Sequence, residues 1–149
     1  MKISSVLAAI AALGFGSHAL AAPAPVKVSD AWCRPAPAGA ASAGCYLTLA
    51  AARADSLKSV TTPAAERVEI HDMDMSGGMM RMSTIDVLLL PAGRPVALQP
   101  GAMHLMLIRP TAALASGSVV SITLQFGKAA PITIKAPVAD GAPGPHAHH

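Results

Sequence analysis

Hydrophobic positions in this chain come in short runs, many of them β-branched, and Pro and Gly residues separate the runs. Runs of this length between turn residues predict β-strands. The expected strands are Val26–Cys33, Cys45–Ala50, Leu57–Thr62, Arg67–Met73, Met79–Ser83, Val96–Leu98, Met103–Arg109, Val119–Phe126 and Ile132–Lys135. The stretch Arg34–Ala43, which is rich in Pro and Gly, is expected to be a loop. Many short strands at near-regular spacing predict an all-β sandwich or barrel.

Strand alternation assigns the side chains of one expected strand to two faces. Val68 and Ile70 are expected to point into the core. Glu69, His71 and Met73 then lie together on the opposite face.

The same alternation applies to two later strands. His104 and Met106 share one face, and Met103, Leu105 and Leu107 share the other. Met80 and Met82 share a face of the Met79–Ser83 strand. Two strands therefore each place an imidazole and a thioether side by side.

The N-terminus resembles an export signal. Lys2 supplies a positive charge, Val6–Leu13 is an apolar run, and Ala19-Leu20-Ala21 is a small-residue cleavage pattern. The alternative is a retained membrane anchor, but the apolar run is shorter than the ~20 residues of a comfortable span. We expect residues 1–21 to be a signal peptide cleaved after Ala21. The mature chain is then expected to be periplasmic, with no membrane span.

The remainder divides into three parts. Residues 22–25 form a short linker, residues 26–137 form one domain, and residues 138–149 form a flexible Gly/Pro tail that ends in histidines. The whole chain has 149 residues, a length that suits a single core.

Composition narrows the function. Hydrophobic residues make up 52% of the chain and charged residues 13%, which excludes a disordered charged chain. The net charge of +3 is small, and aromatics amount to 3%, so nucleic-acid binding is not expected. With so few aromatics, the core is expected to consist mostly of Val, Leu, Ile, Ala and Met.

The two cysteines, Cys33 and Cys45, lie on expected strands that the Arg34–Gly44 loop connects. In an exported protein a disulfide between them is one interpretation. Two reduced, buried cysteines and a copper-binding thiolate pair are the others. The sequence leaves these three interpretations open, because it does not reveal the separation of the two Cβ atoms.

The methionines are unusually placed. Of the eight, one is the initiator, five lie between Met73 and Met82, and two flank His104. Methionine is ordinarily core filler, and Met79 and Met103 are the expected core members. Clustering beside histidines favours a different interpretation for the others. Thioethers select Cu(I), and imidazole also suits copper, whereas Mg²⁺ and Ca²⁺ require oxygen ligands.

The spacing His71-x10-Met82-x21-His104-x-Met106, with Met73 after the first histidine, resembles a known signature. It is similar to the His(Met)-x10-Met-x21-His-x-Met motif of the PCu(A)C periplasmic copper chaperones. Further similarity lies in residues 28–35, 43–49 and 100–101, so that the resemblance covers residues 26–127. The resemblance implies a cupredoxin-like β-sandwich or barrel that binds one Cu(I).

Carried over to this chain, the resemblance makes His71, Met82, His104 and Met106 the copper ligands. Met73 is the optional methionine of the motif. It would serve either as an extra ligand or as a neighbour of the ligands. The motif assigns no role to the cysteines.

The implied function is delivery of copper to an acceptor protein, such as the CuA centre of cytochrome c oxidase or another copper chaperone. A copper-resistance or storage protein would use the same ligands. A cupredoxin electron carrier is less favoured, because its site needs a cysteine among the ligands. An enzyme is not expected, since no catalytic motif is present.

The tail carries a second candidate site at His146, His148 and His149. Imidazoles without nearby sulfur suit Cu(II) better than Cu(I). The alternative is a solvated tail without a ligand.

Overall fold

The computed structural model describes residues 25–144, in which ten β-strands and one short 3-10 helix form. In chain order these are β1 (Val26–Cys33), β2 (Ser42–Ala51), β3 (Asp55–Thr61), β4 (Ala65–Asp74), η1 (Ser76–Gly78), β5 (Arg81–Ile85), β6 (Leu88–Leu90), β7 (Val96–Leu98), β8 (His104–Pro110), β9 (Val119–Phe126) and β10 (Ile132–Pro137).

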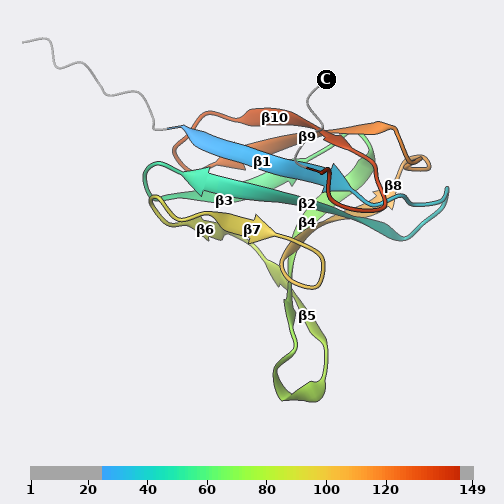
Figure 1. Ribbon diagram of the computed structural model, residues 1–149, viewed down its shortest axis with the longest axis horizontal. Helices are drawn as coiled ribbons and strands as arrows, with labels where there is room; N and C mark the ends of the chain where they lie inside the picture. The colour runs from blue at the N-terminus through green and yellow to red at the C-terminus, as the bar shows by residue number, and fades with distance from the viewer. Residues whose placement is uncertain (1–24, 145–149) are drawn as a thin grey trace, which may run out of the picture.

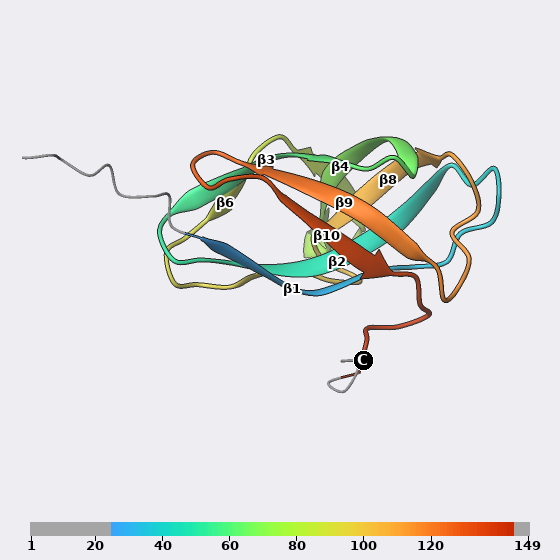
Figure 2. The ribbon, with the colours of Figure 1, turned by 90° about the horizontal axis from the view of Figure 1, so that it is seen from above.

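The strands form two antiparallel sheets that lie against each other as a sandwich (Figure 2). The larger sheet has six strands in the order β1-β2-β8-β4-β5, with β7 also paired to β2. The smaller sheet has four strands in the order β10-β9-β3-β6. The predicted all-β sandwich is therefore confirmed.

The core between the sheets is aliphatic. Leu47, Leu49, Leu105 and Leu107 of the larger sheet are almost fully buried, and Leu57, Ile122 and Leu124 of the smaller sheet face them. No methionine among the described residues is buried. Of the two methionines expected in the core, Met103 packs against it and is partly buried, whereas the prediction for Met79 is wrong.

The Met79 prediction fails for a local reason. Met79 is 65% exposed and lies in the loop before β5, which begins at Arg81 rather than at Met79. Gly77 and Gly78 just before it have φ values of 77° and 74°. This left-handed conformation suits glycine and reverses the chain there, so the strand begins later than the apolar pattern indicates. The same turn places Met80 outside β5, so the expected face shared with Met82 does not follow from strand alternation.

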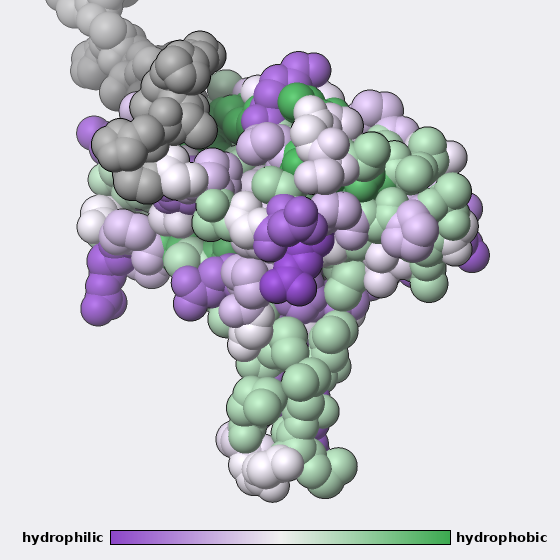
Figure 3. Space-filling model, turned by 45° about the vertical axis from the view of Figure 1, so that its right-hand side comes forward, coloured by the Kyte–Doolittle hydropathy of each residue, from purple (hydrophilic) through white to green (hydrophobic). Residues whose placement is uncertain are grey.

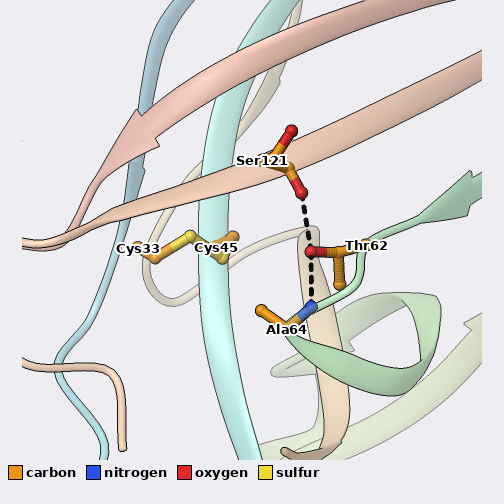
Figure 4. Close-up of a disulfide and its surroundings, with 5 residues drawn as sticks. All are labelled: Cys33, Cys45, Thr62, Ala64 and Ser121. Carbon is orange, nitrogen blue, oxygen red and sulfur yellow. Dashed lines mark hydrogen bonds between the residues drawn. A yellow bond between two sulfur atoms is a disulfide. The ribbon is translucent and has the colours of Figure 1, made fainter. Parts of the chain in front are cut away.

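Cys33 and Cys45 form a disulfide in the structure (Figure 4). They are directly paired between β1 and β2, and both are completely buried. Val138, just beyond β10, forms a bridge with Cys33, and the Ala139 amide donates to the Cys33 carbonyl over 2.9 Å. The packed region thus continues past Pro137, where the tail was expected to start.

The smaller sheet is joined to the loop before β4 close to this disulfide. The Thr62 hydroxyl donates to the Ser121 carbonyl of β9 over 2.6 Å and accepts from the Ala64 amide over 3.2 Å (Figure 4). This contact fixes the start of β4, the strand that carries the first candidate ligand.

One hairpin leaves the sandwich altogether (Figure 1). The β4–β8 pairing ends at His71 and His104, whereas the β4–β5 pairing continues to Asp74 and Arg81. We call residues 72–84 the arm. Because the arm is supported by no third strand, its side chains are largely exposed. The two candidate histidines lie at the base of the arm.

Candidate metal centre

The strand register brings the candidate ligands to one face of the larger sheet. His71 is paired with His104, Met73 with Met82, and Glu69 with Met106. Paired residues in a sheet point to the same side, and this is the side away from Leu105 and Leu107. Three neighbouring strands therefore supply a common patch of imidazole and thioether groups.

The His71 ring is held between a carboxylate and a thioether. Its Nε2 lies 2.8 Å from Glu69 Oε2, and its Nδ1 lies 3.0 Å from Met82 Sδ. In the tautomer whose Nε2–H group donates to the carboxylate, the Nδ1 lone pair faces the sulfur. Two metal-donor atoms thus converge at one point. A carboxylate on the far nitrogen is the common support of a metal-binding histidine.

Glu69 is anchored from its other side as well. The Arg67 guanidinium lies 2.7 Å from Glu69 Oε1. Hydrogen bonds from His71 and then from Arg67 hold the pKa of Glu69 below its ordinary value of 4.5. The carboxylate is therefore ionised at neutral pH and accepts a hydrogen bond from the imidazole N–H group. Sequence alternation placed Glu69 beside His71, but its role as a support becomes visible only from these contacts.

The His104 ring is fixed by the turn that precedes its strand. The Gln99 amide donates to the Met103 carbonyl over 2.8 Å, and Gly101 supplies the positive φ of 80° that the turn requires. The turn presents the Ala102 carbonyl 2.9 Å from His104 Nδ1. Nδ1–H is the donor in this contact, which leaves Nε2 free as a donor atom for a metal.

The two imidazoles are close to each other. Their ring centroids are 5.8 Å apart, with the planes at 72°. His104 is 5% exposed, although it lies on the face opposite the core. Met106 is partly buried two residues further along β8. The structure thus brings His71 into contact with Met82 and places His104 and Met106 beside them on the same face.

Tyr46 of β2 lies beside His104 on this face, and Trp32 of β1 packs against Tyr46. The ring of Tyr46 is centred 6.4 Å from the His104 ring and 4.7 Å from the ring of Trp32. Gly44, opposite Met106, leaves the space that Tyr46 uses, since a Cβ at Gly44 would lie 2.7 Å from the Tyr46 hydroxyl. Sequence reasoning did not place these aromatics at the site, because their strands lie far from His104 in the chain.

The donor set fits a soft ion rather than a hard one. Within residues 25–144 no group of three or more His, Cys, Asp or Glu side chains is placed to hold a metal. The converging atoms are imidazole nitrogen and thioether sulfur, which suit Cu(I). Cys33 and Cys45 are joined in the buried disulfide, so they present no thiolate to this face.

Three sequence predictions lie outside the described residues: the signal peptide, most of the linker, and the tail histidines His146, His148 and His149. Within the described part, no helix has the length and apolar character that a membrane crossing requires.

Solved structures of similar fold are copper-related domains. The chain superposes on the "Copper-bound PCuAC domain from PmoF2" with a TM-score of 0.66 and 26% identity, over 81% of this chain and 97% of that one. The "Solution structure of CuI-DR1885" from Deinococcus radiodurans gives a TM-score of 0.61 and 25% identity, over 85% and 84% of the two chains. The fold and the site therefore define a PCuAC-type domain with a cupredoxin-like sandwich.

The family is also identified from the sequence. The family model described as "Putative lipoprotein LpqE-like" matches residues 26–138. A curated relative, "Putative lipoprotein Lxx21020" of Leifsonia xyli subsp. xyli, is 28% identical over 77% of this chain and 70% of its own length. The chain belongs to the LpqE-like family, which is of the PCuAC type.

Proposed function

We propose that this protein is an exported copper chaperone. It binds one Cu(I) ion through His71, Met82, His104 and Met106, and it passes the ion to a copper-acceptor protein. The observation that carries this proposal is the approach of His71 Nδ1 to Met82 Sδ. The ring of His104 is centred 5.8 Å from the ring of His71. The similar solved structures include a copper-bound PCuAC domain and CuI-DR1885, which supports the same cargo.

The ligand set can hold a monovalent ion without a large charge imbalance. Imidazole and thioether ligands are neutral, so the bound ion keeps its single positive charge. The Glu69 carboxylate, which is hydrogen-bonded to His71, offsets that charge. Hydrogen bonds already fix one nitrogen of each ring. Little reorganisation is therefore needed when the ion binds.

The exposure of the ligands indicates how the ion is released. Met82 is 50% exposed, whereas His104 is 5% exposed beneath Tyr46. An acceptor's ligand reaches the ion from the Met82 side and replaces that thioether first, while His104 holds the ion until the exchange is complete. This order keeps the ion bound to protein throughout the transfer.

The acceptor in this proposal is a copper protein in the periplasm, such as the CuA centre of cytochrome c oxidase or another copper chaperone. A cleaved signal peptide at residues 1–21 accounts for the location. A storage protein would use the same four ligands, and the two functions differ in the amount of copper bound per chain.

Anaerobic Cu(I) titration against a chromophoric chelator tests the proposal. The chain from Ala22 to Gly144 removes the tail histidines but keeps Val138, which is packed in the core. We expect one tight equivalent, lost or greatly weakened in His71→Ala and in Met82→Leu. Met103→Leu, the same chemical change as Met82→Leu beside the core, should retain it. Absence of tight binding, or binding unaffected by both ligand changes, would refute the site, and several tight equivalents would favour storage.

A further inference from the structure

We call His71, Met82, His104 and Met106 together the four-ligand centre. The end of the arm carries three further methionines that are not among these ligands. Met75, Met79 and Met80 are 59%, 65% and 61% exposed. We call them the tip methionines. On the face shown in Figure 3 the arm is mostly hydrophobic, with near-neutral residues beside hydrophobic ones at its end. Packing does not account for this concentration of apolar side chains.

Exposure of these side chains is unfavourable for stability. Burying a methionine contributes about 1.5–3 kcal/mol relative to leaving it in water. None of the tip methionines receives this contribution, and no methionine among the described residues fills the core. A role in a chemical contact explains their placement better than a role in folding.

The tip methionines are close together in the chain and in space. They lie within the six-residue segment 75–80, which the paired residues Asp74 and Arg81 close. Met75 and Met80 adjoin that pair, so they start on opposite sides of a narrow hairpin. The unbranched side chain has three rotatable bonds, which lets sulfur atoms in such a loop meet at one point.

The turn that holds them is ordered by its own hydrogen bonds. The Asp74 carboxylate accepts from the Ser76 amide over 2.7 Å and from the Ser76 hydroxyl over 2.8 Å. These bonds lower the pKa of Asp74, so the carboxylate is charged at neutral pH. Asp72 adds a second negative charge on the arm and Arg81 one positive charge, which leaves the arm net negative and favourable for a cation.

The tip is continuous with the four-ligand centre. Met73 and Met82 are paired across the arm, two residues nearer its base than Met75 and Met80. Thioethers therefore recur along the arm from the tip to Met82, which contacts His71.

We propose that the tip methionines form a second binding site for a soft monovalent ion, a thioether-only site that holds Cu(I) more weakly than the four-ligand centre. Without an imidazole the tip is the weaker site, and at the end of the arm it is the more accessible one. An ion bound there is positioned to pass along Met73 and Met82 to or from the centre. The relay role rests on the proposed function, whereas the binding site itself does not.

The test uses Ag(I), a soft monovalent ion that has no redox change under these conditions, and NMR of methionine methyl groups labelled with ¹³C. The chain from Ala22 to Gly144 is compared with Met75→Leu/Met79→Leu/Met80→Leu and with Met103→Leu. Each of these three proteins is also prepared with the added substitutions His71→Ala and Met82→Leu, which remove the four-ligand centre. Amide spectra verify that every variant is folded.

We expect two equivalents of Ag(I) in the unaltered chain, the second weaker and accompanied by shifts of the tip methyl groups. The triple tip variant should lose the second equivalent and keep the first. The variant without the four-ligand centre should keep the weaker equivalent, and Met103→Leu should change neither.

Tip methyl groups that do not shift, or a second equivalent that survives the triple variant, would overturn the inference. Failure of the proposed function is a separate result: the tight equivalent would be absent while the tip methyl groups still shift.

Discussion

Glu69 offers the sharpest test of how the centre is organised. Its carboxylate accepts a hydrogen bond from His71 Nε2–H over 2.8 Å, and this contact directs the Nδ1 lone pair toward Met82. Replacing Glu69 by Ala removes both the acceptor and the negative charge. Replacing it by Gln keeps an oxygen that accepts the same hydrogen bond but removes the charge.

The size of the effect follows from the environment. Loss of a group that supports a metal-binding histidine ordinarily weakens metal affinity about 10- to 100-fold. The side chain of Glu69 is 27% exposed and that of His71 is 12% exposed. Because solvent screens the carboxylate, we expect the lower end of the range: a decrease of about tenfold in Cu(I) affinity for Glu69→Ala and a smaller decrease for Glu69→Gln.

Two measurements check this prediction. Chelator competition gives the Cu(I) affinity, and ¹⁵N NMR of the imidazole reports which nitrogen of His71 carries the proton. Glu69→Ala should lower the population of the Nε2–H tautomer. The matched control is Glu66→Ala, which removes a carboxylate of the same strand that pairs with Arg109 away from the centre. An unchanged affinity in Glu69→Ala, or an equal loss in Glu66→Ala, would refute the reasoning.

Three further predictions concern the frame around the centre. Cys33→Ala/Cys45→Ala should lower the free energy of unfolding by about 3 kcal/mol, because the bond closes a loop of sequence separation 12; equal urea midpoints with and without the bond would contradict this. Partial burial acts to raise the pKa of Asp55, but amide hydrogen bonds outweigh it and hold that pKa below its ordinary 3.8. Asp55→Asn should therefore cost about 1 kcal/mol at pH 7, and the difference from the unaltered chain should vanish as pH falls below 3.8; a difference independent of pH in urea unfolding would refute it. Gly44→Ala should cost about 1–3 kcal/mol by displacing Tyr46, with a change in tryptophan fluorescence, and adding Tyr46→Phe should recover part of the loss; a stable Gly44→Ala protein with unchanged fluorescence would disprove the close approach.

Much of the strand pattern is visible in the sequence. Val26–Cys33, Val96–Leu98 and Val119–Phe126 have the predicted bounds, and most other strands differ by a few residues at their ends. Leu88–Leu90 was not predicted, because three leucines in a row show no alternation and their pairing with β3 is a tertiary contact. Met79–Ser83 was placed too early, because the apolar pattern runs through a turn that Gly77 and Gly78 dictate.

The chemistry of the candidate centre was accessible from the sequence for a simple reason. Donor atoms are fixed by residue type, and the period of two along a strand decides which side chains share a face. His71 and Glu69 therefore share one face of their strand, and His104 and Met106 share one face of theirs, whatever those strands pair with.

What the sequence by itself determined is thus the all-β class, the soft donor set and the face on which it lies. Only the tertiary structure decided that β4 and β8 meet at His71 and His104, that Tyr46 buries His104, and that the arm exposes its methionines. Each of these depends on contacts between segments far apart in the chain. A local pattern of hydrophobic and polar residues carries the orientation of side chains, but it contains no information about which strand becomes the neighbour of another or at which register.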